Sequence, residues 1–320
     1  MIKIIFIFLL PVVLLASPSW LYKIEYDKKH DIIGYGISEN LREAKKNAIA
    51  DITNTLHVSV DSSLDMINND ENGKLSQSTA THLSTSSKAV LSGVKYIKVE
   101  KLDKLWYVAA KYDNSSLDIK LKKLLPDNLK DEIQNAYLKN TPLIRKLNKE
   151  FNVKLNYQII RKDNLWQLQY KDILLPINMK NFYQLFSNQE TNELSIKPNK
   201  DIYKENDNMF FYIKHKNSGY LSLLYVEHNG KVGVLLANKK SKKTFTFPDI
   251  KKEDSFKIVN PYGKTIKELY VVLYSKTPIN LHKFENIGDN LLDESNYNFD
   301  KLLLKFSKYD FSTYEIKIRK

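Results

Sequence analysis

Residues 32–60, which read IIGYGISENLREAKKNAIADITNTLHVSV, place an extended apolar segment directly before an amphipathic helix. Apolar side chains in the second half recur at spacings of three or four residues, the spacing of one helical face: Leu41, Ala44, Ala48, Ile52 and Leu56. The small alanine side chains allow such a helix to lie close to a sheet. This stretch therefore predicts a unit in which one helix covers a sheet.

The neighbouring segments supply the expected strands of this unit. Strand-like alternation predicts extended segments at residues 20–26, 31–35, 94–99 and 105–112. Ser38 is the expected N-cap of the helix, with Glu39 in its first turn. Residues 58–60 read as a further extended segment and residues 68–73 as a polar turn, whereas residues 75–92 carry no clear pattern.

The pair Gly34 and Gly36 invites comparison with a phosphate-binding loop, because it precedes a helix. The third glycine of a dinucleotide fingerprint is missing, and Glu39 stands in its place, where its charge would repel phosphate. We interpret the two glycines as a tight turn from strand to helix that needs glycine torsion angles.

The first 16 residues, MIKIIFIFLLPVVLLA, have the form of a secretory signal. Lys3 precedes an apolar run that is shorter than the roughly 20 residues a spanning helix needs. Cleavage is expected between Ala16 and Ser17, and an uncleaved anchor is the alternative. The chain contains no Cys, which suits export to an oxidising periplasm.

Residues 115–190 predict a mixed region of helices and a hairpin. Helices are expected at residues 117–125, 127–139, 142–152 and 179–186, and a hairpin at residues 153–170 that turns at Asp163 and Asn164. Because helices followed by a hairpin repeat the plan of residues 17–114, a degenerate second copy of that unit is one interpretation.

Residues 191–320 predict a β-sandwich. Seven short strands are expected between residues 194 and 275, followed by a helix near residues 299–306 and a last strand at 314–318 that closes a sheet edge. The pair Asn229 and Gly230 between two apolar runs is a strong hairpin signal. The predicted fold class is α+β: a helix-on-antiparallel-sheet unit at 17–114, a mixed region at 115–190 and a β-sandwich-like domain at 191–320.

Charge and composition exclude several classes of function. The net charge is +13, from 50 Lys and Arg against 37 Asp and Glu, but only four of the basic residues are Arg. Since nucleic-acid binding favours the planar guanidinium group, nucleic acid is not expected as a partner. The lack of Cys excludes disulfides, thiolate metal sites, a Cys nucleophile and an anchor on an N-terminal Cys.

Motifs for catalysis, metals or cofactors are missing from the sequence. The six His show no pairing at i,i+4 and no adjacent acidic cluster, although His215 and His228 could approach across a hairpin. There is no G-x-S-x-G, and the S-x-x-K at Ser92 to Lys95 lacks its companion motifs. We therefore expect no catalytic residue, no metal site and no cofactor, and we expect that the protein is not an enzyme.

Two stretches resemble known families. Residues 32–60, with LWYVAAKYD at 105–113, are similar to the Lpp-twenty family of bacterial outer-membrane lipoproteins, which includes flagellar basal-disk proteins. The matching positions are Gly34, Gly36, Glu43, Ala44, Ala48, Asp51, Trp106, Tyr107 and Val108. The chain lacks the lipidation Cys of that family, so lipoprotein status does not carry over.

Residues 194–276 resemble a widespread family of domains whose function is unknown. The features that carry this second resemblance are Gly219, Tyr220, Asn229, Gly230, the run Leu236 to Asn238, Pro261 and Gly263. Proteins that pair it with an Lpp-twenty-type domain look like envelope or flagellar-disk components.

These observations lead to one expected function and one alternative. The first is an exported scaffold protein of the cell envelope, associated with the flagellar motor disk. It would pack against envelope or flagellar-disk proteins or against further copies of itself, and lie in the periplasm, in association with the outer membrane. The alternative is a periplasmic module that binds peptidoglycan or lipopolysaccharide through the basic residues Lys239, Lys240, Lys242 and Lys243. A solvated loop is the simpler interpretation of these lysines.

Overall fold

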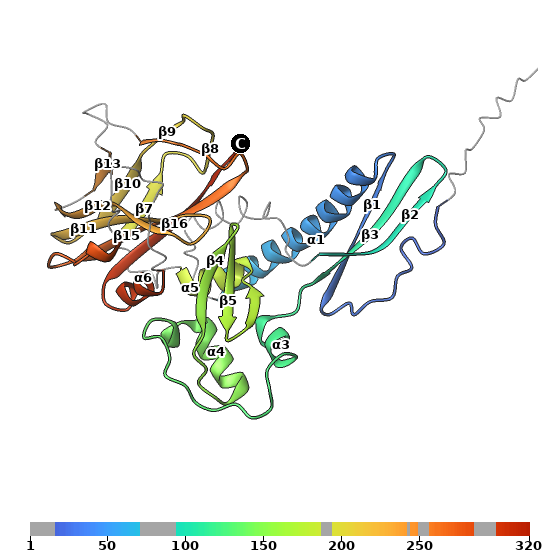
Figure 1. Ribbon diagram of the computed structural model, residues 1–320, viewed down its shortest axis with the longest axis horizontal. Helices are drawn as coiled ribbons and strands as arrows, with labels where there is room; N and C mark the ends of the chain where they lie inside the picture. The colour runs from blue at the N-terminus through green and yellow to red at the C-terminus, as the bar shows by residue number, and fades with distance from the viewer. Residues whose placement is uncertain (1–16, 71–93, 187–193, 242–243, 249–255, 285–298) are drawn as a thin grey trace, which may run out of the picture. The chain divides into compact units, whose positions relative to one another are not determined.

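The computed structural model describes residues 17–70, 94–186, 194–241, 244–248, 256–284 and 299–320 (Figure 1). At residues 57–70 and at position 179 only the backbone is described. The chain divides into two compact units, Met1–Ser115 and Ser116–Lys320. The fold class is α+β, as predicted: the first unit is a helix on a sheet and the second is rich in strands.

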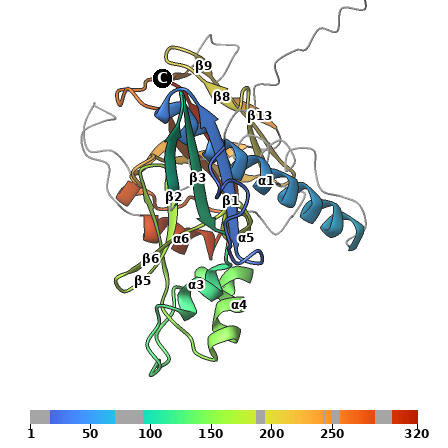
Figure 2. The same cartoon turned by 90° about the vertical axis from the view of Figure 1, so that its right-hand side faces the viewer.

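The N-terminal unit is one helix on a three-stranded antiparallel sheet. Its elements are β1 (Asp31–Ser38), α1 (Leu41–Asp70), β2 (Lys95–Leu102) and β3 (Leu105–Asp113). The strand order is β1-β3-β2, and Figure 2 shows the three strands side by side with α1 next to β1. The core between helix and sheet is small and contains Ala44, Ala48, Ile52, Val108 and Ala110.

The glycines of β1 allow α1 to approach the sheet closely. A Cβ atom at Gly34 would overlap the carbonyl oxygen of Ala48, and one at Gly36 would overlap that of Ala44. Both glycines lie within the strand, and neither has a positive φ. The expected strand-to-helix turn is therefore wrong: these positions need glycine for space and not for torsion angle.

Three other local predictions in this unit are wrong. Asn40, and not Ser38, caps α1, because its side chain accepts hydrogen bonds from the backbone N–H groups of Arg42 and Glu43. The helix continues to Asp70 through the segment expected to be extended at 58–60. Residues 20–26 form turns and coil instead of a strand.

The C-terminal unit begins with short helices and a three-stranded hairpin sheet. The helices are α3 (Leu117–Lys122), η1 (Leu138–Asn140), α4 (Pro142–Phe151) and α5 (Met179–Phe186), and the strands are β4 (Gln158–Lys162), β5 (Leu165–Tyr170) and β6 (Ile173–Pro176). The helix expected at 127–139 is absent apart from the start of η1. Asp163 and Asn164 both have positive φ, which confirms the predicted hairpin turn.

Two further sheets form a sandwich. The larger has the order β12 (Val232–Ser241), β11 (Gly219–Val226), β15 (Ile266–Ser275), β16 (Asp310–Ile318) and β8 (Ile202–Tyr203). The smaller has the order β13 (Phe245–Phe247), β10 (Phe211–His215) and β7 (Leu194–Pro198), while β9 (Asn208–Met209) pairs with β14 (Phe256–Lys257). The remaining helices are η3 (His282–Phe284) and α6 (Phe299–Phe306).

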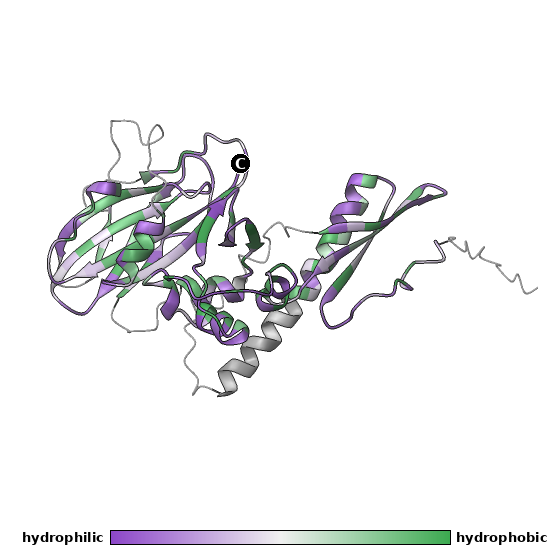
Figure 3. Ribbon diagram, turned by 60° about the horizontal axis from the view of Figure 1, so that its bottom comes forward, coloured by the Kyte–Doolittle hydropathy of each residue, from purple (hydrophilic) through white to green (hydrophobic). Residues whose placement is uncertain are grey.

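The five-stranded sheet is buried on both faces. One face packs on the small sheet, with Leu223 and Val272 meeting Phe211 in one core. The other face, with Leu224 and Val271, shares a core with α6, α5 and the β4–β5 hairpin. Figure 3 shows hydrophobic and hydrophilic residues interspersed along the strands of the C-terminal unit. The sequence regions 115–190 and 191–320 thus share one core, since the hairpin covers the sheet face that the sandwich leaves open.

Candidate functional site

Strand β2 is exposed along almost its whole length. Seven of its eight residues are exposed, and they include the large apolar side chains of Tyr96, Ile97 and Val99 at 40%, 36% and 44% exposure. Within the described residues β2 pairs only with β3, so its outer edge carries unpaired backbone groups. An open edge with apolar side chains is a template for another strand.

The two faces of β2 carry different side chains. Val99 lies opposite Val108 and Tyr96 opposite Ala110, so Val99 and Tyr96 are on the face that α1 partly covers. Because α1 packs over β1 and β3, that face of β2 stays open (Figure 2). The other face carries Lys98 and Glu100.

The N-terminal segment and α1 border β2 without covering it. On the outer face the Trp20 Nε1–H donates to the Glu100 carboxylate over 2.5 Å. On the helix face the Lys45 Nζ lies 4.9 Å from the centre of the Tyr96 ring. Both contacts hold the rim of β2 in place and leave Val99 accessible.

The opposite edge of the sheet, at β1, is closed by α1. The backbone N–H of Tyr35 donates to the Asp51 carboxylate over 2.9 Å, and the side chain of Asn47 donates to the carbonyl of Ile37 over 3.1 Å. Side chains of the helix thus occupy groups that a neighbouring strand would use. Among the described residues the sheet therefore has one edge bonded by the helix, at β1, and one edge without a partner strand, at β2.

A second candidate is a buried charge cluster in the C-terminal unit. The Arg161 guanidinium, whose side chain is fully buried, stacks on Trp166 at 4.5 Å and donates to Glu315 at 3.1 Å. The Trp166 Nε1–H and the Lys267 Nζ also donate to Glu315, at 3.1 and 3.2 Å. Arg161 donates further to the carbonyl of Lys267. This cluster ties the β4–β5 hairpin to β15 and β16.

Burial and neighbouring charges shift the pKa values in this cluster. Burial lowers the pKa of Arg161, while the Glu315 carboxylate opposes that shift. Burial alone would raise the pKa of Glu315, but Lys267 and Arg161 hold it below its usual range. Burial raises the pKa of nearby Glu268 to about 7, against a hydrogen bond from Tyr270. These shifts follow from burial and from the charges of the neighbouring side chains.

The hairpin turn at Asn229 and Gly230 docks on the same cluster. Gly230 has φ of +92°, and a Cβ there would lie 2.9 Å from the carbonyl oxygen of Arg161. The Asn229 side chain accepts from the backbone N–H of Lys231. Asn164 at the tip of the β4–β5 hairpin donates from its backbone to the carbonyl of His228. The predicted turn is confirmed, and it also fixes one hairpin against another.

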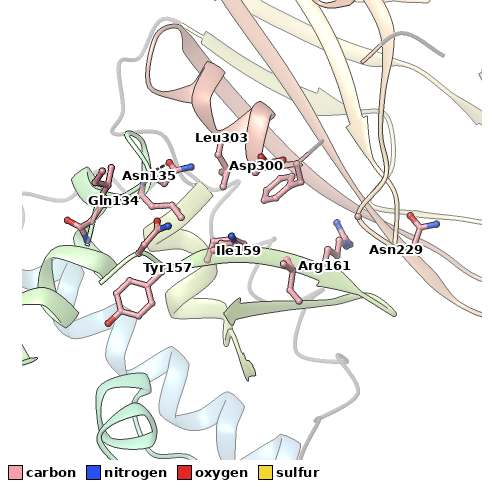
Figure 4. Close-up of a pocket in the computed structure, with 15 residues that line it drawn as sticks. Gln134, Asn135, Tyr157, Ile159, Arg161, Asn229, Asp300 and Leu303 are labelled. Carbon is pink, nitrogen blue, oxygen red and sulfur yellow. Dashed lines mark hydrogen bonds between the residues drawn. The ribbon is translucent and has the colours of Figure 1, made fainter. Parts of the chain in front are cut away.

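A cleft of about 490 Å³ lies beside this junction (Figure 4). It separates the loop with Gln134 and Asn135 from β4 and from α6, which carries Asp300 and Leu303. The α6 wall adjoins residues 285–298, which lie outside the described residues. We therefore assign no ligand to this cleft.

The remaining predicted site residues serve the fold. Gly219 allows Tyr274 and Ser275 to approach, since a Cβ there would contact both. Gly263 has φ of +59° in the turn that follows Pro261. In the N-terminal unit Trp106 packs at the edge of the core, whereas Tyr107 is buried on the opposite face of the sheet.

The last group of predicted site residues comprises the pair partner Tyr220, the four lysines near position 240 and the expected signal cleavage site. Tyr220 pairs with Lys240. Lys239 and Lys240 belong to β12 and not to a loop, and the Lys239 Nζ lies 4.4 Å from the centre of the Phe245 ring. Lys242, Lys243 and Ala16 lie outside the described residues, and Ser17 is exposed.

The two histidines considered for a metal do not meet. His215 precedes β11 and His228 follows it, so the full length of the strand separates them. Among the described residues no group of three or more His, Asp or Glu side chains is arranged to hold a metal ion. In the same part of the chain, no helix is both long enough and apolar enough to span a bilayer.

Sequence reasoning missed both candidate sites. The apolar residues of β2 read as ordinary strand residues, because alternation does not reveal which strand stays at an edge. Arg161 and Glu315 are 154 positions apart, and only the scarcity of Arg in the chain could have drawn attention to Arg161. In comparisons with protein-family models, curated proteins and solved structures, the chain matches none.

Proposed function

We propose that the protein is an exported assembly protein of the cell envelope that acts by strand pairing and packing against protein partners. The observation that carries this proposal is the open β2 edge with exposed Ile97 and Val99, beside a β1 edge that α1 blocks. A protein that works alone is expected to protect such an edge. The signal-like first 16 residues support export, with cleavage after Ala16.

The particular assembly that we propose is the flagellar motor disk, with the protein on the periplasmic side of the outer membrane. This part depends on the resemblance of residues 32–60 and 105–113 to the Lpp-twenty family. The geometry of the N-terminal unit is compatible with the flagellar assignment. Ala44 and Ala48 belong to the pattern that resembles the Lpp-twenty family, and they bring α1 onto β1 and β3, which leaves β2 uncovered.

Gene deletion with motility scoring and cryo-tomography of the motors tests this proposal. We expect loss of swimming and of disk density, both restored by the wild-type gene. A gene with Ile97→Lys and Val99→Lys should not restore them, since two charges replace the apolar side chains of β2. Ile133→Lys, at a position 94% exposed in the other unit, is the matched control and should restore both. Normal swimming with intact disks would rule out the flagellar assignment.

Sedimentation with cell-wall sacculi separates the alternative function. The proposal expects no saturable binding. Salt-sensitive binding that Lys239→Ala with Lys240→Ala abolishes would instead favour a module that recognises peptidoglycan or bound lipopolysaccharide through the basic end of β12.

A further inference from the structure

The sequence of β2 is complementary to itself. Lys98 and Glu100 flank Val99, so an antiparallel copy centred on Val99 places each Lys98 opposite a Glu100. Opposite charges in directly facing positions stabilise an antiparallel pair, and like charges destabilise it. We propose that β2 pairs with β2 of a second copy, with Val99 facing Val99 at a twofold axis. This inference rests on the proposed function, because it names the partner of the same edge.

Symmetry leaves few other registers. A twofold axis perpendicular to the sheet keeps the two helix-covered faces together, so residues of one face must stand opposite residues of the same face. Because every second residue of a strand lies on the same face, the two copies of β2 can shift past each other only by two residues at a time. One step in one direction places Lys98 opposite Lys98, and one step in the other places Glu100 opposite Glu100. Of these three registers, the one centred on Val99 alone avoids like charges in directly facing positions in the middle of the strand.

The apolar side chains add to this pairing. In the proposed register Val99 lies against Val99 of the second copy on the helix face, where it is now 44% exposed. Ile97 is the extra residue of a β-bulge between Tyr96 and Lys98, so the regular register runs from Lys98 towards the end of the strand. Lysines on an edge strand commonly prevent pairing with another strand. In the proposed register each Lys98 instead faces the carboxylate of Glu100 in the second copy.

The same geometry predicts a closed dimer. Pairing through β2 would give a continuous sheet of six strands whose two outer edges are both β1. Asp51 and Asn47 of α1 already bond to Tyr35 and Ile37 at that edge. Further strand addition is therefore blocked, and the assembly stops at two copies.

Disulfide trapping tests the register directly, because the chain has no Cys of its own. Facing residues of an antiparallel pair have Cβ atoms roughly 4.5–5.5 Å apart, close to the span of a disulfide. Full-length protein with Val99→Cys is expected to form a covalent dimer under mild oxidation. Ile133→Cys is the control: its position is even more accessible, at 94% exposure against 44% for Val99, and it should not form a covalent dimer.

Charge exchange tests the complementarity. Lys98→Glu places two Glu opposite each other, and Glu100→Lys places two Lys opposite each other. Each variant alone should dissociate at least about tenfold more readily than wild type in analytical ultracentrifugation. An equimolar mixture of the two should associate again as a heterodimer. Circular dichroism checks that both variants fold, which matters for Glu100→Lys because Trp20 donates to this carboxylate.

The outcomes distinguish this inference from the proposed function. A monomeric wild type without a Val99→Cys dimer would overturn self-pairing, as would single charge variants that dimerise like wild type. If Val99→Cys in cells is trapped on a different envelope protein instead, the second copy is wrong but the assembly function stands. If Val99→Cys forms no cross-link at all and the deletion strain has normal motors, both the self-pairing of β2 and the proposed assembly function are wrong.

Discussion

Strands β2 and β15 differ in composition and lie in opposite surroundings. β2 (KYIKVEKL) has four charged residues in eight, whereas β15 (IKELYVVLYS) has two in ten. β15 lies between β11 and β16 and packs on both faces, so seven of its ten residues are buried. Within the part of the chain that the structure describes, β2 pairs with β3 alone, and seven of its eight residues are exposed. The charged residues thus gather on the strand at the edge of its sheet, and the apolar residues that this strand also carries stay exposed.

The largest effect should come from the buried charge that joins the hairpin to the sheet. Arg161→Ala removes the fully buried cationic partner of Glu315 and leaves Lys267 and Trp166 as its remaining donors, and we expect a loss of about 3–5 kcal/mol in the free energy of unfolding of the C-terminal unit. Urea titration followed by Trp166 fluorescence measures it. Lys46→Ala, which removes the exposed pair with Glu43 in the N-terminal unit, should change stability by less than about 0.5 kcal/mol.

The comparison of the two strands can be tested by matched truncations. Leu273→Ala in β15 creates a cavity in a fully buried site and should destabilise the protein by about 2–5 kcal/mol. Val99→Ala in β2 should change the unfolding free energy by less than about 0.5 kcal/mol at a protein concentration where the chain is monomeric. Equal losses at the two positions in urea titrations would contradict the assignment of β2 as a surface.

Glycine replacement separates close packing from backbone torsion. Gly36→Ala forces α1 away from β1, because the new Cβ overlaps the carbonyl of Ala44, and should cost about 1–3 kcal/mol. A Cβ atom added at Gly263 would meet no atom within 4 Å. Gly263→Ala therefore costs only the strain of an alanine at positive φ, about 1 kcal/mol. Thermal unfolding monitored by Trp106 for the first variant and Trp166 for the second gives the two values. If Gly263→Ala lowers stability more than Gly36→Ala does, backbone strain at positive φ costs more than the steric overlap at Gly36.

The dependence of stability on pH tests the buried carboxyl of Glu268. The Glu268 carboxyl has a pKa of about 7 in the folded protein against 4.5 for the ordinary group. Between these values the unfolded chain gives up its proton first, so the stability of the C-terminal unit falls as pH rises from 4.5 to 7, by roughly 2–3 kcal/mol. Glu268→Gln should remove this slope while keeping an acceptor for Tyr270. If Glu268→Gln leaves the pH profile of the urea titrations unchanged, the buried proton belongs to a group other than Glu268.

Local patterns predicted much of the fold because the contacts behind them are short-range. The apolar stripe from Leu41 to Leu56 gives α1, and the turn residues Asp163, Asn164 and Gly230 give two hairpins. The helix expected at 127–139 failed for the converse reason. There the backbone of Glu132 bonds to Lys154, and its carboxylate accepts from Asn156, so tertiary contacts replace those of a helix.

The candidate sites could not be predicted in the same way. Whether β2 stays open depends on α1 lying over β1 and β3, which the spacing of its alanines does not specify. The Arg161 cluster depends on β4, β15 and β16 meeting across more than 100 residues of chain. Neither arrangement has a local signal.

The sequence by itself determined the fold class, the positions of most strands and turns, and the closeness of the helix to a sheet, since periodicity and side-chain size act over a few residues. Only the tertiary structure decided that β1 is closed while β2 is open, and that the middle hairpin completes the core of the sandwich. The physical reason is that an exposed edge and a buried charge are properties of what covers them, and the covering elements come from distant parts of the chain.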